Sequence, residues 1–338
     1  MNANEVKGKI QLLQKEMHFS GVYHAKKKEI DYSGSFGYAN RSDRIKNNSQ
    51  TRFGIASGCK IFTSIAVCQL VEQGLLSFQT KLHECLPIDF PAYSKEVNIH
   101  QLLTHTSGVP DYFDEEKMDD YEELWIDNPV YAIRSLHDFL PLFQNREMTS
   151  LPSSEFHYNN AGYILLGLIV EQISEMKFTD YVERFIFEKA GMMHSGYFEM
   201  DKLPDNTALG YIEEPDGSYK TNVFSVPAKG GADGGAFVTA EDMVTFWDAL
   251  FNHRLVSEKM TEKLFQPQIE VEEDLYYSYG GYVDMDQGKV KKHILIGYDP
   301  GCNFRSVYYP ENSISIVVCS NESDGAFEVL KELEKLII

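Results

Sequence analysis

The sequence predicts a mixed α/β protein, in which an antiparallel sheet flanked by helices is joined to a mainly helical region. Two observations lead to this prediction. Both ends of the chain carry a helix together with strand patterns, and the long middle carries mostly helices. A chain of 338 residues, 43% of them hydrophobic, is also long enough to bury one large core.

The N-terminal segment supplies the first helix and the first pair of strands. Residues 3–17 have helical periodicity. The segments 21–25 and 29–37 have the pattern of two strands, which the turn Lys26-Lys27-Lys28 joins into a hairpin.

The C-terminal segment also contains two predicted strands and a predicted helix. Residues 304–309 and 313–319 predict a second hairpin around Pro310-Glu311-Asn312, and an amphipathic helix follows over 325–338. Because both ends provide strands, we expect them to build one sheet together.

The middle of the chain consists mainly of helices and turn-rich loops, with a strand-like interval near 207–226. We therefore expect one compact unit with two parts. Residues 1–56 and 251–338 form the sheet region, and residues 57–250 form the mainly helical region.

The charge of the chain excludes some classes of partner. Fifty-one acidic residues against 31 basic ones give a net charge of −20, so nucleic acid and anionic membranes are disfavoured as partners. The N-terminus is polar and lacks the apolar core of a signal peptide, and no apolar stretch is long enough to span a bilayer. We expect a protein without a membrane span.

The cysteines predict a reducing compartment. They form an odd set without the spacing of a metal site, and most lie in apolar runs, as buried free thiols do. The ten histidines show no metal-binding spacing either, so we expect no metal and no cofactor. A cytoplasmic protein is the simplest expectation. The cysteines are Cys59, Cys68, Cys85, Cys302 and Cys319.

The segment Ser57-Gly58-Cys59-Lys60, at the start of a long apolar helix, is the strongest indication of function. A serine and a lysine three residues apart lie on one face of a helix, so the amine of Lys60 can take the proton of the Ser57 hydroxyl. The helix N-terminus adds free N–H groups and a partial positive charge, which can form half of an oxyanion hole. The pattern suits acyl transfer.

A second Ser-x-x-Lys, Ser174-Glu175-Met176-Lys177, provides an internal comparison. It closes the apolar helix that runs through 165–173, where serine and lysine are expected as solvated residues of a helix C-terminus. We therefore assign the chemistry to Ser57 and not to Ser174.

A further polar cluster, Tyr158-Asn159-Asn160, precedes another apolar helix, and Asn160 is a candidate N-cap of that helix. A purely structural role, with Asn160 as a cap and Tyr158 packed in the core, is one interpretation. The other is catalytic, because a tyrosine near an ammonium can transfer a proton and an asparagine can hold a substrate amide.

Together these segments resemble the penicillin-recognising serine hydrolases, in the branch of class C beta-lactamases, DD-peptidases and related esterases; Ser-x-x-Lys is one of their motifs. The resemblance covers most of the chain and implies a beta-lactamase/transpeptidase-like fold with a cleft between its two parts. It is carried, in order, by 37–41, 53–60, 102–112, 158–163 and 234–243.

The resemblance implies a role for each matching residue. Ser57 is the acylated nucleophile, Lys60 its proton partner, Tyr158 the general base and acid, and Asn160 a contact to the substrate amide. On the strand that lines the cleft, Gly297 allows close approach of the substrate and the N–H of Tyr298 completes the oxyanion hole.

The chain departs from the family at the third motif, which normally has Lys or His, a small residue and Gly. Aligning on Pro300-Gly301 places Leu295 where the cation belongs. His293 lies two residues earlier and is either a replacement cation, brought closer by a bulge, or a surface residue. Loss of the cation disfavours carboxylate-bearing beta-lactams and favours neutral esters and amides.

Three other features receive structural interpretations. In the family, the segment that contains His105 is a structural helix-to-loop element, so His105 is expected to be a hydrogen-bonded structural residue. The glycine-rich stretch 229–235 lacks the ending of a phosphate loop and is expected to be a turn beside the cleft. No Gly-x-Ser-x-Gly elbow is present.

The sequence thus predicts a cofactor-independent serine hydrolase that forms an acyl-enzyme on small ester, amide or peptide substrates. It is expected to be closer to an esterase or peptidase than to an efficient beta-lactamase. The alternative is a weak or inactive member of the fold that serves as a ligand-binding or regulatory protein, and Leu295 is its main support.

Overall fold

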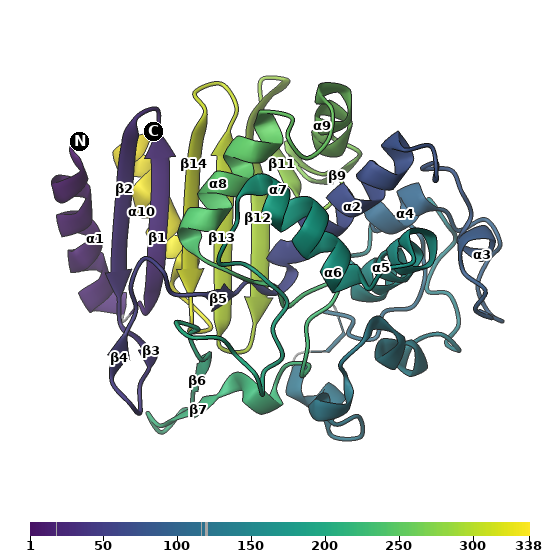
Figure 1. The fold of residues 1–338 in the computed structure, drawn as a ribbon, viewed down its shortest axis with the longest axis horizontal. Helices are drawn as coiled ribbons and strands as arrows, with labels where there is room; N and C mark the ends of the chain where they lie inside the picture. Colours follow the sequence, from purple (N-terminus) through teal and green to yellow (C-terminus); the bar gives the residue numbers. More distant parts are fainter. Residues whose placement is uncertain (18, 116, 119–120) are drawn as a thin grey trace.

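An eight-stranded antiparallel sheet forms the frame of the molecule (Figure 1). The computed structural model describes residues 1–17, 19–115, 117–118 and 121–338. Along the sheet the strands follow the order β2-β1-β14-β13-β12-β11-β10-β9. They are β1 (Gly21–Lys27), β2 (Ile30–Phe36), β9 (Ile269–Glu272), β10 (Leu275–Tyr277), β11 (Tyr282–Asp286), β12 (Lys289–Asp299), β13 (Cys302–Tyr309) and β14 (Ile314–Ser320).

The two chain ends meet inside this sheet, as the sequence predicts. Strand β1 pairs with β14 in a register that runs from Gly21 opposite Ser320 to Lys27 opposite Ile314. Alternate side chains of β1 enter different cores: Tyr23 and Ala25 face one side, whereas Val22 faces the other. The sheet is therefore buried on both faces, which explains the long apolar runs in its central strands.

Helices cover both faces of the sheet. Helices α1 (Ala3–Met17) and α10 (Ala326–Ile337) pack on one face, and α8 (Ala240–Phe251) crosses the other (Figure 1). The amphipathic pattern of α10 places its apolar residues on the sheet. The mixed α/β class with an antiparallel sheet is confirmed.

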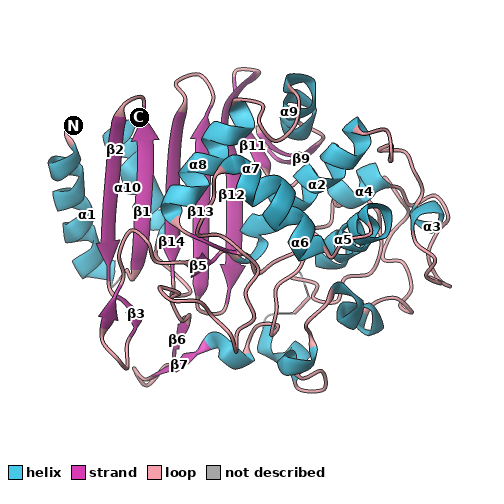
Figure 2. Cartoon of the chain, in the orientation of Figure 1, coloured by secondary structure: helices cyan, strands magenta, loops and turns pink. Residues whose placement is uncertain are grey.

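The remaining helices gather beside the sheet, around α2 and α5 (Figure 2). One continuous core extends from them to the strands, since it contains Ile65 and Leu166 as well as Leu295 and Phe304. The helices are α2 (Lys60–Glu72), α3 (Leu82–Cys85), α4 (Ile99–Leu103), α5 (Asn160–Ser174), α6 (Phe178–Val182), α7 (Glu188–Ala190) and α9 (Glu258–Phe265).

Short elements complete the fold. The small strand pairs are β3 (Tyr38–Asn40) with β4 (Ile45–Lys46), β5 (Phe53–Gly54) with β8 (Phe237–Val238), and β6 (Tyr211–Glu213) with β7 (Tyr219–Thr221). The short 3-10 and π-helical segments are η1 (Ala56–Cys59), η2 (Tyr121–Trp125), η3 (Val130–Ala132), η4 (Leu136–Leu142), η5 (Glu183–Phe187) and η6 (Asn222–Phe224).

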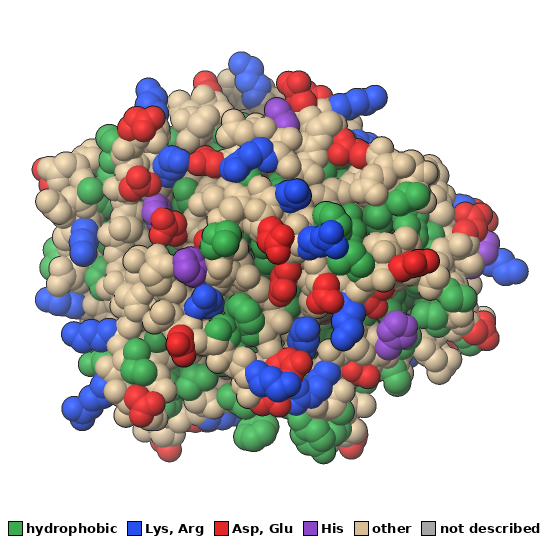
Figure 3. All heavy atoms as spheres, in the orientation of Figure 1, with side chains coloured by type: hydrophobic (Ala, Val, Ile, Leu, Met, Phe, Trp, Pro, Cys, Tyr) green, Lys and Arg blue, Asp and Glu red, His purple; other side chains and the backbone are tan. Residues whose placement is uncertain are grey.

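The surface mixes both signs of charge despite the net charge of −20. Figure 3 shows acidic and basic side chains interspersed over one face of the molecule, with small apolar groups between them. Among the helices of the described residues, none is long and apolar enough to cross a membrane.

Candidate active site

Ser57 lies where a strand turns into a helix. Strand β5 ends at Gly54, η1 begins at Ala56, and α2 continues directly from Lys60. Ala56 has a φ of 45°, a left-handed conformation that is costly for a residue with a side chain. This backbone conformation, immediately before the candidate nucleophile, fixes the direction in which the Ser57 side chain points.

Lys60 connects three segments of the chain at this point. Its Nζ lies 2.9 Å from Ser57 Oγ, 2.7 Å from Asn160 Oδ1 and 2.7 Å from the backbone oxygen of Asp233. The side chain is only 1% exposed. A buried lysine amine with every direction occupied cannot swing away from Ser57.

Asn160 reaches Lys60 from the start of α5. The sequence-based assignment of Asn160 as the N-cap is wrong. Asn159 has the extended backbone of a cap, and its Oδ1 accepts the N–H of Gly162 at 2.7 Å. Asn160 is the first helical residue, which leaves its side chain available to Lys60.

Tyr158 stands over the same amine. Lys60 Nζ lies 4.9 Å from the centre of the Tyr158 ring. Burial raises the pKa of the Tyr158 hydroxyl well above its ordinary value and the charge of Glu115 raises it further, while a hydrogen bond with Ser57 acts in the opposite direction. The resting side chain is therefore a neutral phenol at neutral pH.

His105 supports Tyr158 from behind. Their ring centres are 4.5 Å apart, and His105 Nδ1 accepts the backbone N–H of Asn159 at 3.0 Å. Burial lowers the pKa of His105 well below its ordinary value, with the Lys60 charge adding to the effect. A neutral, buried and hydrogen-bonded imidazole is the structural role expected from the sequence.

These residues border a cavity of about 660 Å³, a size typical of small-molecule sites. Ser57, Tyr158 and Asn160 lie on its wall, and the glycines of 230–235 form part of its rim. The described residues that line it include Glu115, Glu122, Asp233 and Asp299 but no lysine, arginine or histidine. A substrate in this cavity meets no basic wall residue in the described part of the chain.

Strand β12 forms the opposite wall. A Cβ at Gly297 would lie 1.9 Å from the backbone oxygen of Ile55, so only glycine lets the strand come this close to η1. Ile296 and Tyr298 line the cavity, and their side chains are 37% and 57% exposed. The backbone of Tyr298 is thereby brought next to the segment that carries Ser57.

Leu295, which stands where the family has a cation, and His293, its candidate replacement, both lie outside the cavity. Leu295 is 1% exposed and belongs to the hydrophobic core, and it does not line the cavity. His293 is neither a surface residue nor a cation of the cleft. It is 4% exposed and packs against Phe251 and Phe265, and burial lowers its pKa to about 3. The strand alternates regularly here, so His293 and Leu295 both face the core.

Asp299 adds an ionisable group to the cavity wall. Burial raises the pKa of its carboxyl to about 7, and the nearby charge of Asp233 contributes in the same direction. Asp299 is thus partly protonated at neutral pH.

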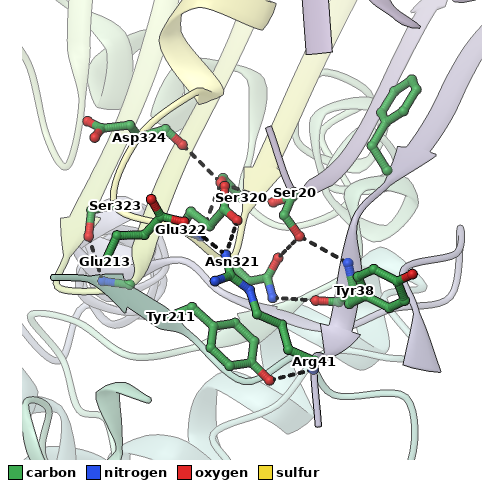
Figure 4. Close-up of polar contacts among 12 residues, drawn as sticks. Ser20, Tyr38, Arg41, Tyr211, Glu213, Ser320, Asn321, Glu322, Ser323 and Asp324 are labelled. Carbon is green, nitrogen blue, oxygen red and sulfur yellow. Dashed lines mark hydrogen bonds and ion pairs between the residues drawn. The ribbon is translucent and has the colours of Figure 1, made fainter. Parts of the chain in front are cut away.

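The far end of the cavity is polar. Ser320, Asn321 and Ser323, which lie at and just after the end of β14, line it. Asn321 Nδ2 donates to the backbone oxygens of Tyr38 (3.0 Å) and Leu209 (2.9 Å), as part of the network in Figure 4. These bonds tie the sheet to the loops that close this end.

The second Ser-x-x-Lys behaves as the sequence predicts. Ser174 is the last residue of α5, and its hydroxyl donates to the backbone oxygen of Val170 at 2.6 Å. Lys177 lies outside the helix, after Glu175 in a left-handed conformation. The Ser174 hydroxyl is therefore engaged in a local hydrogen bond at the end of α5.

For three residues of the site, Asp111, Tyr112 and Asp233, the sequence indicates the segment but not the role. Asp111 accepts the backbone N–H groups of Asn160 and Ala161, and the Tyr112 hydroxyl donates to the Asp233 carboxylate. The only signal in the sequence is a Pro-Asp-Tyr in a turn-rich loop, and no periodicity connects it to positions about 50 or 120 residues away.

A serine beside a buried lysine, in a cleft between an antiparallel sheet and a group of helices, defines a serine hydrolase of the beta-lactamase/transpeptidase-like fold. The chain belongs to the Beta-lactamase family, whose model matches residues 9–336. The resemblance seen in the sequence is confirmed, and the protein is a serine hydrolase of this family.

Known relatives agree with this assignment. The chain is 28% identical to penicillin-binding protein 4* of Bacillus subtilis (strain 168), over 96% of this chain and 74% of the relative. A penicillin-binding protein from Bacillus halodurans has the same fold with a TM-score of 0.94 and 52% identity, covering 97% of this chain and all of the other. D-amino acid amidase from Ochrobactrum anthropi SV3 shares the fold alone, with a TM-score of 0.82, 20% identity and coverage of 99% and 98%.

Proposed function

We propose that the protein hydrolyses neutral esters or amides through an acyl-enzyme on Ser57. The observation that carries the proposal is the distance of 2.9 Å between Lys60 Nζ and Ser57 Oγ at the wall of a cavity of about 660 Å³. A nucleophile and a base within hydrogen-bond reach, beside a space for substrate, meet the geometric requirement for covalent catalysis.

In the proposed acylation, Lys60 acts in its neutral amine form. Its nitrogen takes the Ser57 proton while Oγ attacks the substrate carbonyl, because a neutral phenol at position 158 cannot accept that proton. The Tyr158 hydroxyl then gives its proton to the leaving group, and the Lys60 ammonium returns a proton to Tyr158. The base role that the sequence suggested for Tyr158 thus passes to Lys60.

Two backbone N–H groups, those of Ser57 and Tyr298, are proposed to hold the negative charge on the substrate oxygen. The close approach of β12 to η1 at Gly297 supports this arrangement. Asn160 is proposed to bind the substrate amide. It keeps one N–H for this purpose, since its Nδ2 carries two hydrogens and Asp111 accepts one of them at 3.3 Å. Water then releases the acyl group and regenerates Ser57.

The proposed preference for uncharged substrates rests on the composition of the cavity wall. Its described residues offer four carboxyl groups and no basic side chain, and all three directions of the Lys60 amine are already occupied. A substrate carboxylate would lose its hydration without gaining a cationic partner. Penicillins and cephalosporins are therefore expected to be poor substrates.

Steady-state kinetics on one short-chain p-nitrophenyl ester and one chromogenic cephalosporin test this function. We expect measurable turnover of the ester, feeble turnover of the cephalosporin and loss of both in Ser57→Ala. The control is Asp89→Asn, which removes an exposed carboxylate away from the cavity and should leave both rates unchanged. Efficient cephalosporin hydrolysis would contradict the substrate assignment, and no Ser57-dependent turnover would favour a ligand-binding member of the fold.

A further inference from the structure

The Lys60 amine is aimed at Ser57 by two acceptors from distant parts of the chain. In the form that takes the Ser57 proton in the proposed acylation, the amine has two N–H groups and one lone pair. Asn160 Oδ1 and the backbone oxygen of Asp233 each lie 2.7 Å from Nζ and accept the two N–H groups. The remaining direction, where the lone pair lies, faces Ser57 Oγ. The aim of the base therefore depends on how firmly these two acceptors are held.

Asp111 holds the first acceptor. Its Oδ2 accepts the backbone N–H of Asn160 at 2.8 Å and the Asn160 Nδ2 at 3.3 Å, while its Oδ1 accepts the N–H of Ala161 at 2.9 Å. Both carboxyl oxygens of Asp111 accept backbone N–H groups, and the amide nitrogen of Asn160 faces them. The amide oxygen of Asn160 is turned toward Lys60.

Tyr112, the next residue in the chain, holds the second acceptor. Its hydroxyl donates to Asp233 Oδ2, and Asp233 belongs to a tight turn in which Gly231 N–H donates to the Gly234 oxygen at 2.8 Å. Asp111 and Tyr112 are 5% and 2% exposed, so water does not compete for these bonds. Asp111 does not line the cavity; Tyr112 does, but its hydroxyl is committed to Asp233.

We infer that the dipeptide Asp111-Tyr112 is the positioning element of the active site, which fixes both acceptors of the Lys60 amine and so directs its lone pair at Ser57. This inference rests on the proposed function of Ser57 and Lys60. It assigns to the Asp111 carboxyl group and the Tyr112 hydroxyl a role in the rate of acylation.

The test is a double-mutant cycle on kcat, with Asp111→Asn, Asn160→Ala and the pair together. Because an asparagine at position 111 also presents a donor, it no longer fixes the Asn160 amide. We expect kcat to fall about 10- to 100-fold at nearly unchanged KM, as for a misplaced catalytic group. If Asp111 acts through Asn160, adding Asp111→Asn to Asn160→Ala should cause no further loss.

Tyr112→Phe provides a second, independent arm, since the ring still packs. It should lower kcat about tenfold, again without a change in KM. The matched controls are Asp242→Asn and Tyr93→Phe. These positions are buried and hydrogen-bonded too, but they contact backbone or side chains away from Lys60, so they should lower the unfolding temperature and leave kcat unchanged.

The outcomes distinguish failure of the positioning inference from failure of the proposed function. Wild-type kcat in both Asp111→Asn and Tyr112→Phe, or a multiplicative effect in the cycle, would overturn this inference while leaving Ser57 chemistry intact. If Asp111→Asn does not fold, the Tyr112→Phe result decides. Absence of Ser57-dependent turnover in the wild type would instead refute the proposed function, and the inference with it.

Discussion

At the level of single residues, burial decides which group can take a proton. Tyr158 and Lys60 are close together, and burial makes ionisation of the phenol unfavourable, which supports the proposal that Lys60 accepts the Ser57 proton and Tyr158 donates one. The sequence shows that these residue types are present. It does not show their burial, and therefore their division of labour emerges only in three dimensions.

Tyr158→Phe tests this division. The ring still packs on His105, so folding should be preserved. Without the hydroxyl, kcat should fall by about 10²- to 10⁴-fold, the usual range for loss of general acid–base help. The loss should be smaller for a p-nitrophenyl ester, whose leaving group needs little protonation, than for an amide. Equal losses on both substrates would remove Tyr158 from the role of general acid.

Ile296→Lys tests whether a missing cation limits the use of beta-lactams. Ile296 is 37% exposed and lines the cavity, so a lysine there can present its ammonium to a substrate carboxylate. A charge-assisted hydrogen bond contributes about 1.5 to 3 kcal/mol, so cephalosporin acylation should rise about tenfold to a hundredfold. The rate constant of acylation in stopped flow is the measurement.

Leu295→Lys is the matched variant, one residue away. Because Leu295 faces the core, the new ammonium would be buried without a partner, and the free energy of unfolding should fall by about 3–5 kcal/mol with no gain in acylation. A gain from Leu295→Lys but not from Ile296→Lys would show that the side chains of β12 face the opposite way to that described.

At the level of elements, the contact between β12 and η1 sets the geometry of the proposed oxyanion site. Gly297→Ala would place a methyl group 1.9 Å from the Ile55 oxygen, so strand and helix must separate. A displacement of about 1 Å can cost about 10² in rate, and we expect at least that loss in kcat/KM.

Gly8→Ala is the control for this change. Gly8 lies in α1 with no atom near its absent side chain, so alanine should stabilise the helix by about 0.5–1 kcal/mol and leave activity unchanged. Activity of Gly297→Ala equal to that of Gly8→Ala would exclude the close approach of β12 as a catalytic requirement.

The elements at the two chain ends could be predicted because their signals are local. The helix over 3–17, the two hairpins and the C-terminal helix follow from periodicity and turn residues, and all are present, although Lys26 and Lys27 belong to β1 and not to the turn. The boundary at Asn159 and Asn160 could not be assigned, since two adjacent asparagines are equally good caps by residue type. Only the hydrogen bond from Gly162 to Asn159 distinguishes them.

The site was only partly predictable for a related reason. The spacing of three residues suggested Ser57 and Lys60, whereas Tyr158 and Asn160, at the start of α5, were assigned roles only through the family resemblance. Asp111, Tyr112 and Asp233 support Lys60 through contacts between remote loops, which no local pattern encodes. The burial of His293 likewise depends on α8 and α9, which supply Phe251 and Phe265.

At the level of the whole molecule, buried carboxyl groups link stability to pH. Burial raises the pKa of Asp299 to about 7, against about 3.9 in an unfolded chain. Between these values the folded protein holds a proton that the unfolded chain has released. This contribution to stability is therefore full below about pH 4, is lost as pH rises toward 7, and stays lost above it.

Asp299→Asn removes this pH dependence. The variant should be more stable than the wild type by about 1 kcal/mol at pH 5 and by about 4 kcal/mol at pH 8, since a difference of one in pKa is about 1.4 kcal/mol. Urea unfolding at the two pH values measures the gain. The same stability difference at both pH values would show that Asp299 keeps an ordinary pKa.

The central claim, that Ser57 is the acylated nucleophile, is tested most directly by intact-mass spectrometry and peptide mapping after treatment with a fluorophosphonate. We expect one adduct per chain, on the peptide that contains Ser57, no adduct in Ser57→Ala and undiminished labelling in Ser174→Ala. Equal labelling of Ser57→Ala and wild type, or an adduct that maps to Ser174, would contradict it.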